Sequence, residues 1–251
     1  METTHRTEQR SCAKHGPYDT RLVIVAGKEL ALTRCPTCSQ EQDVAEAARV
    51  ARENETRRKA QAAEMETRSN IPPRYKFVTL DGYEAKPGSQ AQVHQRCQWF
   101  ATTWPERLTA GTSLILAGLP GTGKTHLACA IAHEVMRHGH SVIYSTIADM
   151  TRSIRRTYDQ DVKRSEAEAI SDFVRPQLLI LDEVGAASGS EHEKLMLFEV
   201  INKRYEQVKG TIVVSNLTGD DLKSFLGERM MDRLRQGGGK LLVLDWQSYR
   251  R

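Results

Sequence analysis

The chain has 251 residues, enough for one domain of ordinary size and a second, small one. Hydrophobic residues make up 39% and charged residues 27%, which is typical of globular proteins and excludes fibrous and membrane-embedded classes. The formal net charge of +4 permits contact with nucleic acid but does not argue for it. No apolar run approaches the roughly 20 residues of a membrane span, and the N-terminus lacks the apolar region of a signal peptide. We therefore expect a cytoplasmic protein with no membrane partner.

Three of the five cysteines lie near the N-terminus, together with a histidine. Cys12 and His15 form one short-spaced pair, and Cys35 and Cys38 form a second. Three thiolates and an imidazole fill the closed tetrahedral shell of a structural Zn²⁺ ion. Between the pairs, the apolar runs 22–25 and 29–32 flank Ala26-Gly27-Lys28, which predicts a β-hairpin. Residues 1–40 are therefore predicted to be a small zinc-ribbon-like module.

Other interpretations of the cysteines remain possible at this point. The N-terminal cysteines could be free thiols in an unstructured segment. A redox role for the CxxC pair is opposed by the lack of a surrounding thioredoxin-like pattern. Cys97 and Cys129 stand alone in apparently helical stretches and are most simply buried apolar residues.

Residues 41–70 are predicted to be a charged helical connector. Residues 40–68 contain no Gly or Pro and are rich in Ala, Glu and Arg, which favour a helix supported by ion pairs such as Glu53 with Arg57. Its apolar side is weak, so a solvated helix is the default and packing against a partner is the alternative. Pro72 and Pro73 end it. The aromatic-rich residues 75–108 then predict a docking segment, with a helix over about 89–104.

Residues 118–125 match the P-loop pattern G-x-x-x-x-G-K-[ST], whose glycines let backbone N–H groups approach nucleotide phosphates. Lys124 is expected to reach the β- and γ-phosphates, and the Thr125 hydroxyl is expected to hold Mg²⁺. The apolar run 113–117 and the helical pattern 126–137 flank the motif, so the phosphates would lie at a helix N-terminus. This context opposes a chance match in a glycine-rich turn. The predicted ATP-binding residues are Gly118, Pro120, Gly121, Thr122, Gly123, Lys124, Thr125 and His126.

Four further apolar runs follow at βα intervals, over residues 141–144, 177–181, 211–214 and 240–244. Strands that alternate with helices predict an α/β fold with a parallel sheet covered on both faces. Asp182 and Glu183 directly follow the run 177–181. An apolar strand followed by two carboxylates is the Walker B arrangement. Asp182 is expected to orient Mg²⁺, and Glu183 to polarise the attacking water as a general base. An ordinary helix cap is the alternative.

Asn216 ends the next strand, where an amide could hold the attacking water, although Asn is also a common turn residue. Taken together, these motifs resemble an AAA+ ATPase. Residues 226–234, which contain Gly-Glu-Arg, and the later Trp246-Gln-Ser-Tyr-Arg250 narrow this resemblance. The chain resembles the DnaC-type replicative helicase loaders over residues 71–251, with IstB-type transposition ATPases as relatives.

This resemblance implies roles for residues that spacing alone leaves open. Arg229 matches an arginine finger that acts in trans on a neighbouring subunit, so self-association is expected. Asn216 matches the first sensor and Arg250 the second. Arginine suits positive roles at phosphates because it stays charged and binds oxygens in a fork. Without the resemblance, Arg229 would most simply form a surface salt bridge. The resemblance also implies that the helical lid of many AAA+ proteins is absent.

Residues 147–173 are longer than a simple crossover. In the loader and initiator families an extra helix here lines a channel for single-stranded DNA. Arg152, Arg155 and Arg156 would supply charge that binds phosphates without sequence preference. Acidic residues dilute this run, so a solvated helix is the alternative.

The family resemblance predicts an ATP-dependent loader of the hexameric replicative DNA helicase. ATP, Mg²⁺ and Zn²⁺ are its expected cofactors. Many loaders begin with a helical domain that grips the helicase, whereas this chain begins with the expected zinc module, and zinc-bearing N-termini occur among related loaders. An IstB-like transposition helper ATPase, which would bind duplex DNA and a transposase, is the first alternative. A nucleotide-binding adaptor that does not hydrolyse ATP is the second.

Overall fold

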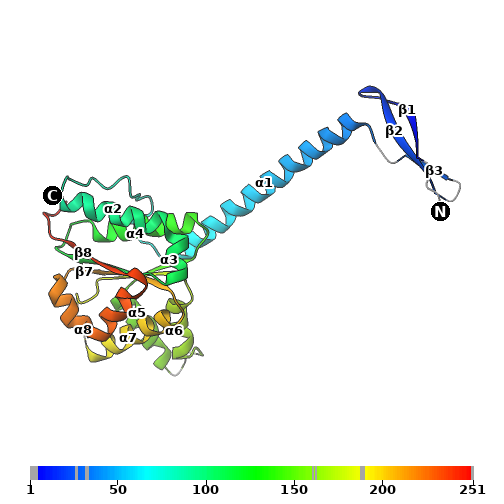
Figure 1. Ribbon diagram of the computed structural model, residues 1–251. Helices are drawn as coiled ribbons and strands as arrows, with labels where there is room; N and C mark the ends of the chain where they lie inside the picture. Colours follow the sequence, from blue (N-terminus) through cyan, green and yellow to red (C-terminus); the bar gives the residue numbers. More distant parts are fainter. Residues whose placement is uncertain are drawn as a thin grey trace. The chain divides into compact units, whose positions relative to one another are not determined.

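The computed structural model describes residues 5–25, 28–31, 34–159, 161, 163–186 and 190–249. The chain divides into two compact units, Met1–Ala60 and Gln61–Arg251 (Figure 1). Helix α1 (Pro36–Arg68) begins in the first unit and ends in the second. No helix in the described ranges is both long and apolar enough to cross a bilayer.

The first unit contains a three-stranded antiparallel sheet in the order β1-β2-β3. Strand β2 (Gly16–Val25) pairs with β3 (Lys28–Ala31), which confirms the expected hairpin; Ala26 and Gly27 of its turn lie outside the described residues. Strand β1 (His5–Cys12) was not expected, because its polar sequence has no alternating apolar residues. It places Cys12 directly opposite Gly16, at the turn that precedes β2.

Helix α1 begins four residues earlier than predicted, at Pro36, because proline is tolerated in the first turn of a helix. No residue of α1 is buried, as the weak apolar side indicated. Ion pairs one turn apart support the helix, although Glu53 pairs with Arg49 at 3.1 Å rather than with Arg57. Near its end, the half-buried Met65 packs against the core of the second unit.

The second unit is built on a five-stranded parallel sheet in the order β5-β6-β7-β4-β8. Each predicted strand is confirmed to within two residues. The strands are β4 (Leu114–Gly118), β5 (Val142–Thr146), β6 (Leu178–Asp182), β7 (Gly210–Ser215) and β8 (Lys240–Leu244). Strands β6, β7 and β4 are parallel neighbours, so their carboxyl ends lie at the same edge of the sheet. Ligands bind at this edge in open α/β sheets.

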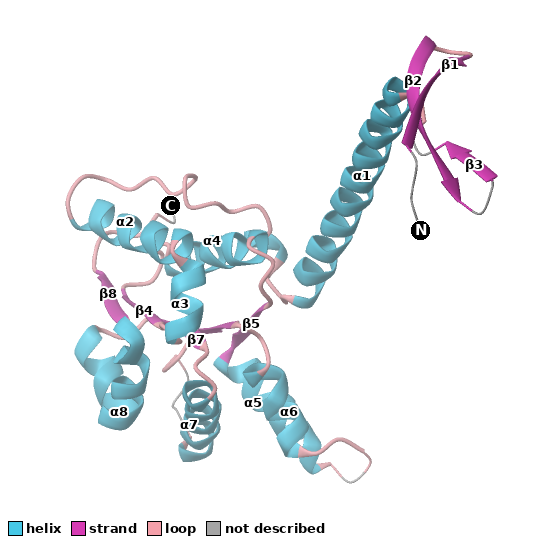
Figure 2. Ribbon diagram, turned by 45° about the vertical axis from the view of Figure 1, so that its right-hand side comes forward, coloured by secondary structure: helices cyan, strands magenta, loops and turns pink. Residues whose placement is uncertain are grey.

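Helices cover both faces of this sheet (Figure 2). One face carries α2 (Ser89–Thr102), α3 (Trp104–Ala110) and α4 (Lys124–Arg137), packed on strand residues such as Leu116 and Ile180. The other carries α5 (Ile147–Arg155), α6 (Glu166–Val174), α7 (Glu191–Glu206) and α8 (Gly219–Arg235), packed on Ile115 and Leu179. Both faces are buried, which explains why the strands read as continuous apolar runs. Short 3₁₀ helices span Pro73–Tyr75, Arg156–Tyr158 and Gln236–Gly238.

Pro105 explains why one predicted helix is divided into two. Helix α2 ends two residues earlier than expected, and Pro105 lies in the first turn of the separate helix α3, since proline fits there and not in a helix interior.

Cys97 on α2 and Cys129 on α4 are fully buried, as predicted, and burial raises the pKa of each thiol to about 12.

Candidate nucleotide and metal sites

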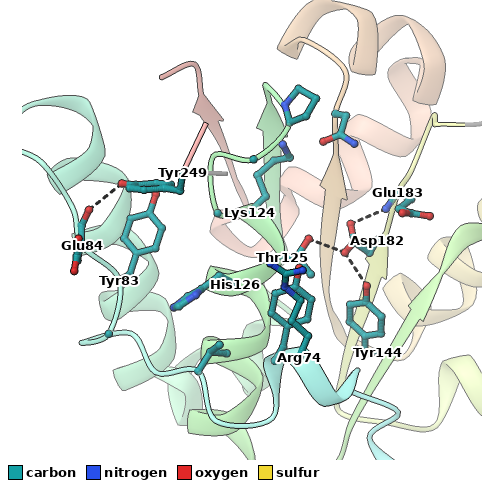
Figure 3. Close-up of a pocket in the computed structure, with 17 residues that line it drawn as sticks. Arg74, Tyr83, Glu84, Lys124, Thr125, His126, Tyr144, Asp182, Glu183 and Tyr249 are labelled. Carbon is teal, nitrogen blue, oxygen red and sulfur yellow. Dashed lines mark hydrogen bonds between the residues drawn. The ribbon is translucent and has the colours of Figure 1, made fainter. Parts of the chain in front are cut away.

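A cleft of about 950 Å³ opens at the edge of the sheet where β4, β6 and β7 end (Figure 3). Six of the eight predicted ATP-binding residues line it, together with the predicted catalytic residues of β6 and β7. These are Pro120, Gly121, Gly123, Lys124, Thr125, His126, Asp182, Glu183 and Asn216. The other two, Gly118 and Thr122, lie in the same loop but do not line the cleft. Thr122 is fully buried, and a Cβ on Gly118 would lie 2.1 Å from the carbonyl oxygen of Leu244.

The P-loop connects β4 to α4 as its motif requires. Gly123 has a φ of 92° and precedes the first residue of α4, Lys124, so the helix N-terminus faces the loop. Lys124 Nζ donates to the carbonyls of Gly118 at 2.9 Å and Leu119 at 2.7 Å, which keeps the ammonium group against the loop. Backbone N–H groups, a helix dipole and a lysine thus converge at one place, which is suited to a polyphosphate.

Asp182 at the end of β6 accepts three hydrogen bonds. Its Oδ2 accepts from Thr125 Oγ1 at 2.9 Å and from Tyr144 OH at 2.8 Å, and its Oδ1 accepts from Glu183 N at 2.7 Å. The two predicted Mg²⁺-binding side chains, from β6 and α4, therefore lie in contact. A carboxylate beside a hydroxyl is a donor set of the hard oxygen type that Mg²⁺ prefers, so these residues fit that ion.

Tyr144 was missed by sequence reasoning. It is buried on β5, and burial, then the charge of Asp182, raises the pKa of its hydroxyl. A tyrosine in a buried strand signals that its hydroxyl needs a partner. The partner could not be identified without knowing that β5 neighbours β6.

Glu183 and Asn216 line the cleft together with Asp182. Glu183 is exposed and has a φ of 60°, a left-handed conformation that is uncommon for a residue with a side chain. Its neighbour Val184 is fixed, because Val184 N donates to Val214 O and Val184 O accepts from Ser215 Oγ at 2.6 Å. Such strain is typical of functional positions held by rigid surroundings.

A further wall of the cleft comes from the segment before β4. Sequence reasoning could not say which residues of this segment reach the cleft. They are Arg74, Tyr75, Val78, Gly82, Tyr83 and Glu84, and Tyr249 joins them from the C-terminal end. Three histidine rings bond to backbone carbonyls of this segment: His133 to Tyr75 at 2.9 Å, His126 to Thr79 at 3.2 Å and His94 to Leu80 at 2.7 Å. The wall is therefore fixed to α2 and α4.

The Gly-Glu-Arg element breaks helix α8. Gly227 has a φ of 74° and a ψ of 164°, so the helix changes direction one residue before Glu228. Arg229 is exposed, and its guanidinium lies 5.2 Å from the Phe198 ring centroid. Arg233, one turn later, lies 4.8 Å from the same centroid and is half-buried. Arg250, the expected second sensor, lies outside the described residues.

The expected DNA-binding arginines follow one another on α5 and the 3₁₀ turn after it. Arg152, Arg155 and Arg156 are all exposed. Arg152 pairs with Asp149 at 2.8 Å, so part of its charge is neutralised within α5. Further along, Arg164 pairs with Asp172 of α6.

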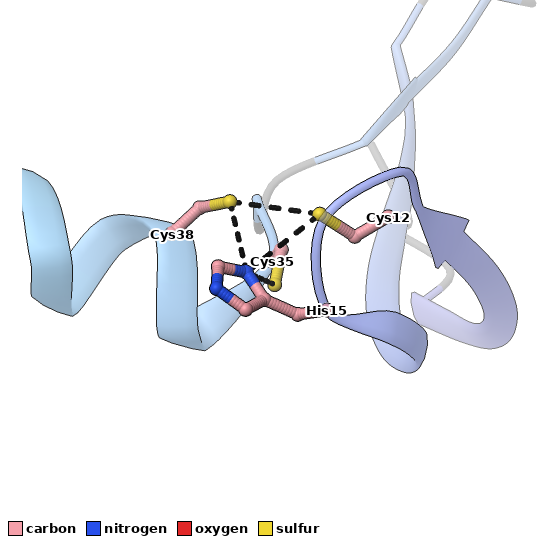
Figure 4. A group of neighbouring side chains, drawn as sticks. All are labelled: Cys12, His15, Cys35 and Cys38. Atoms are coloured by element: carbon pink, nitrogen blue, oxygen red, sulfur yellow. Dashed lines mark hydrogen bonds between the residues drawn. The ribbon is translucent and has the colours of Figure 1, made fainter.

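The four predicted zinc ligands of the first unit converge (Figure 4). Their ligand atoms all lie within 4.8 Å of one another. A tetrahedral Zn²⁺ ion with bonds of about 2.3 Å to sulfur and 2.0–2.1 Å to nitrogen needs S···S and S···N separations of about 3.8 and 3.6 Å. Cys12 Sγ lies 3.5 Å from Cys38 Sγ, and His15 Nδ1 lies 3.2 Å from Cys38 Sγ and 3.6 Å from Cys35 Sγ. The cluster therefore fits zinc with Nδ1 of His15 as the ligand.

The surroundings favour the metal-binding thiolate form at Cys12 and Cys35, whereas the hydrogen bond with Cys12 raises the pKa of the Cys38 thiol to about 11. Backbone N–H groups of Lys14 and His15 lower the pKa of the Cys12 thiol to about 6, which favours the thiolate. The far nitrogen of His15, Nε2, lies 3.2 Å from Glu41 Oε1. A carboxylate on the far nitrogen orients a ligating imidazole and fixes its tautomer.

A profile described as "IstB-like ATP binding protein" matches residues 31–251. The chain belongs to this family. Among its curated relatives, "Replicative helicase loader DnaC" of Buchnera aphidicola subsp. Acyrthosiphon pisum (strain APS) is 33% identical over 183 residues, which is 73% of each chain. DnaC of Escherichia coli (strain K12) is 30% identical over 183 residues, again 73% of each chain. "Uncharacterized protein YdaV" of the same strain is 28% identical over 197 residues, 78% of this chain and 77% of that one.

Solved structures agree on the fold of this IstB-like chain. The crystal structure of the DnaC helicase loader matches with a TM-score of 0.61 at 25% identity and covers 69% of this chain and 99% of that one. AMPPCP-bound DnaA from Aquifex aeolicus matches with a TM-score of 0.58 at 23% identity, over 71% of this chain and 52% of that one. The latter similarity is one of fold alone. The second unit is thus an AAA+ domain, as the motifs predicted.

Proposed function

We propose that this chain is an ATP-dependent loader of a replicative DNA helicase. The contact of Thr125 with Asp182, directly before Glu183, carries the nucleotide half of the proposal. The relatives named replicative helicase loader DnaC, over 73% of the chain, support the helicase half. The AAA+ domain would act as the nucleotide-dependent part, and the N-terminal region would contact the helicase.

In the proposed hydrolysis of ATP, each of these cleft residues has a separate role. The N–H groups of residues 118–125 and the Lys124 ammonium bind the phosphates. Thr125 and Asp182 would hold Mg²⁺, which would supply positive charge beside the phosphates. Glu183 takes the proton of the attacking water as general base. Asn216, which also lines the cleft, orients that water. ATP is converted to ADP and phosphate at this site.

Arg229 completes the site of a neighbouring copy of the chain. Its position just after the break at Gly227 and its exposure support this role, since a residue that acts in trans must project from the surface. Arg250 would be the second sensor within the chain. Because Arg229 and Arg233 share the ring of Phe198, Arg229→Ala and Arg233→Ala are tested side by side. If only Arg233→Ala loses hydrolysis, Arg233, one helical turn later on α8, would have the role in trans instead of Arg229.

The partners follow from charge and from the metal module. Arg152, Arg155 and Arg156 would bind the phosphates of single-stranded DNA, with affinity that falls steeply as salt rises. The module formed by Cys12, His15, Cys35 and Cys38 would hold Zn²⁺ as a structural ion. Zinc would keep the small sheet folded and so present the surface that binds the helicase.

Co-purification from the host with ATP or with ADP tests this proposal. We expect the tagged chain to recover a hexameric replicative helicase with ATP and less of it with ADP. The family profile also carries the IstB name, so a transposition helper ATPase is the second candidate. Recovery of a transposase and binding to duplex DNA would support that candidate and contradict helicase loading.

A further inference from the structure

Two side chains far apart in the sequence donate to the same backbone carbonyl of the P-loop. Tyr83 OH donates to Thr122 O at 2.8 Å, and Trp246 Nε1 donates to Thr122 O at 3.2 Å. The preceding carbonyl is also held, because Tyr249 N donates to Gly121 O at 2.9 Å. Thr122 itself is fully buried. The two carbonyls before Gly123 are thus fixed by residues that do not belong to the P-loop.

The geometry of the peptide unit gives these contacts a consequence. In a trans peptide the carbonyl of one residue and the N–H of the next point in opposite directions across one plane. A donor that holds Thr122 O on the outside of the loop therefore directs the N–H of Gly123 to the inside. The bond from Tyr249 N does the same for the N–H of Thr122. The inside of the loop is where the phosphates bind.

The donors are themselves held rigidly. The Tyr83 ring packs 5.7 Å from the His94 ring and 5.6 Å from the His126 ring, centroid to centroid. A Cβ on Gly123 would lie 2.5 Å from Tyr83 Cε2, so Gly123 and the ring are in close contact.

The C-terminal tail, defined here as residues 246–249, is fixed in the same way. The Tyr249 hydroxyl lies within hydrogen-bond distance of two acceptors, Glu84 O at 2.8 Å and Gln90 Oε1 at 2.9 Å. A Cβ on Gly121 would lie 2.0 Å from Ser248 Oγ, so the tail packs directly on the loop. The half-buried Trp246 also packs against the core on the α4 side of the sheet.

We infer that Tyr83 and Trp246 are positioning residues for the triphosphate, which set the P-loop N–H groups through the carbonyl of Thr122. The inference rests on the proposed ATP binding at residues 118–125. Preorganised donors lower the cost of binding because the loop need not be ordered by the ligand. Residues before the first core strand and after the last therefore share in setting nucleotide affinity.

The test is the affinity for a fluorescent ATP analogue in Tyr83→Phe, Trp246→Phe and the double variant. Phenylalanine keeps the Tyr83 ring on Gly123 and removes only the donor. Each single variant leaves Thr122 O with one donor, so we expect affinity to fall by less than about threefold. The double variant leaves a buried acceptor without a donor, which costs affinity about tenfold or more. Trp99→Phe, at an exposed tryptophan on α2, is the matched control and should bind as the parent does.

A greater-than-multiplicative loss in the double variant, with unfolding temperatures close to the parent's, supports positioning. Multiplicative effects, or lower unfolding temperatures with unchanged affinity, would overturn it. If the double variant does not fold, the emission of Trp246 decides. It is measured as the difference between the Trp99→Phe and the Trp99→Phe/Trp246→Phe proteins, because the buried Trp104 also emits. A change in this difference on saturation with ATP supports the inference, and no change overturns it. Lys124→Ala separates failure of the proposed nucleotide binding from failure of the positioning inference. If that variant binds ATP as the parent does, nucleotide binding at this loop fails; if it alone loses binding, only the positioning inference fails.

Discussion

The Tyr144 hydroxyl lies 2.8 Å from Asp182 Oδ2 and donates a hydrogen bond to it from the neighbouring strand of the sheet. The same carboxylate oxygen accepts from Thr125, so two hydroxyl groups hold the side chain that is proposed to orient Mg²⁺. Tyr144 is buried, and its raised pKa keeps it a donor at any physiological pH. These two hydrogen bonds thus fix the orientation of Asp182.

Tyr144→Phe removes that donor and keeps the ring. We expect the Mg²⁺ concentration for half-maximal ATP hydrolysis to rise about tenfold, as for the loss of other residues that orient metal ligands. Hydrolysis measured against Mg²⁺ concentration checks this, with Tyr158→Phe at an exposed tyrosine as the control. An unchanged Mg²⁺ requirement would show that Thr125 alone suffices to orient Asp182.

Glu183→Gln removes the proposed general base but keeps the size of the side chain. Because general-base catalysis contributes about 10²–10⁴-fold, we expect single-turnover hydrolysis to slow by about that factor. ATP binding, measured by titration, should stay within about twofold of the parent's, since the amide still occupies the cleft. Hydrolysis at the parental rate would assign the chain to nucleotide-binding adaptors that do not turn over ATP.

Cys38→Ser removes one ligand from the cluster of the first unit. Because the other three ligands leave an incomplete shell, we expect the metal content to fall from close to one zinc per chain to below about one-fifth. The sheet of that unit should also become sensitive to protease, since the metal would stabilise it. The control is Cys97→Ser, in the core of the second unit, and this variant should have the zinc content of the parent protein. If the parent protein contains no zinc after preparation without chelators, the proposed zinc site is contradicted.

Reactivity with a thiol reagent separates the two kinds of cysteine. Burial raises the pKa of Cys97 and Cys129 to about 12, so at pH 8 they remain protonated and inaccessible. After zinc removal we expect Cys12, Cys35 and Cys38 to react within minutes and the other two only in denaturant. The unfolded chain releases those two protons near pH 9, whereas the folded chain holds them to about pH 12. The free energy of unfolding should therefore fall as pH rises through this window. Rapid reaction of five thiols in the native protein would contradict the packing of α2 and α4.

Gly227→Ala tests the break in α8. No atom of the described residues lies within 4 Å of a Cβ at this position, so any cost comes from the φ of 74° and not from a clash. We expect a loss of about 1 kcal/mol in the free energy of unfolding. Hydrolysis should fall further than this loss explains, because Arg229 would point elsewhere. Gly219→Ala, at the start of the same helix with ordinary contacts, is the control. Equal effects of the two variants would show that the break has no special role.

Local patterns in the sequence were enough to predict the sheet and the centre of the site. The strands are buried on both faces, so they appear as apolar runs, and the P-loop and Walker B motifs are contiguous in sequence. Strand β1 was missed because its polar residues show no alternation. Helix α1 begins before the expected start because Pro36 is tolerated as the first residue of a helix, which the helix-forming composition of residues 40–68 does not indicate.

The rest of the site depends on contacts between distant residues. Tyr144 meets Asp182 because β5 pairs with β6, and Tyr83 and Trp246 converge on the carbonyl of Thr122. A backbone acceptor leaves no trace in the sequence, so no spacing rule could find these donors. The resemblance to AAA+ proteins supplied a role for Arg229 but not its contact with Phe198.

Loading of the replicative helicase onto circular single-stranded DNA tests the central claim most directly. The amount of helicase bound per circle is measured with ATP, for the parent chain and for Lys124→Ala. We predict efficient loading by the parent and loading at the background level for the variant, since the variant cannot hold the triphosphate. Equal loading by the two proteins would contradict an ATP-dependent loader and leave a passive clamp.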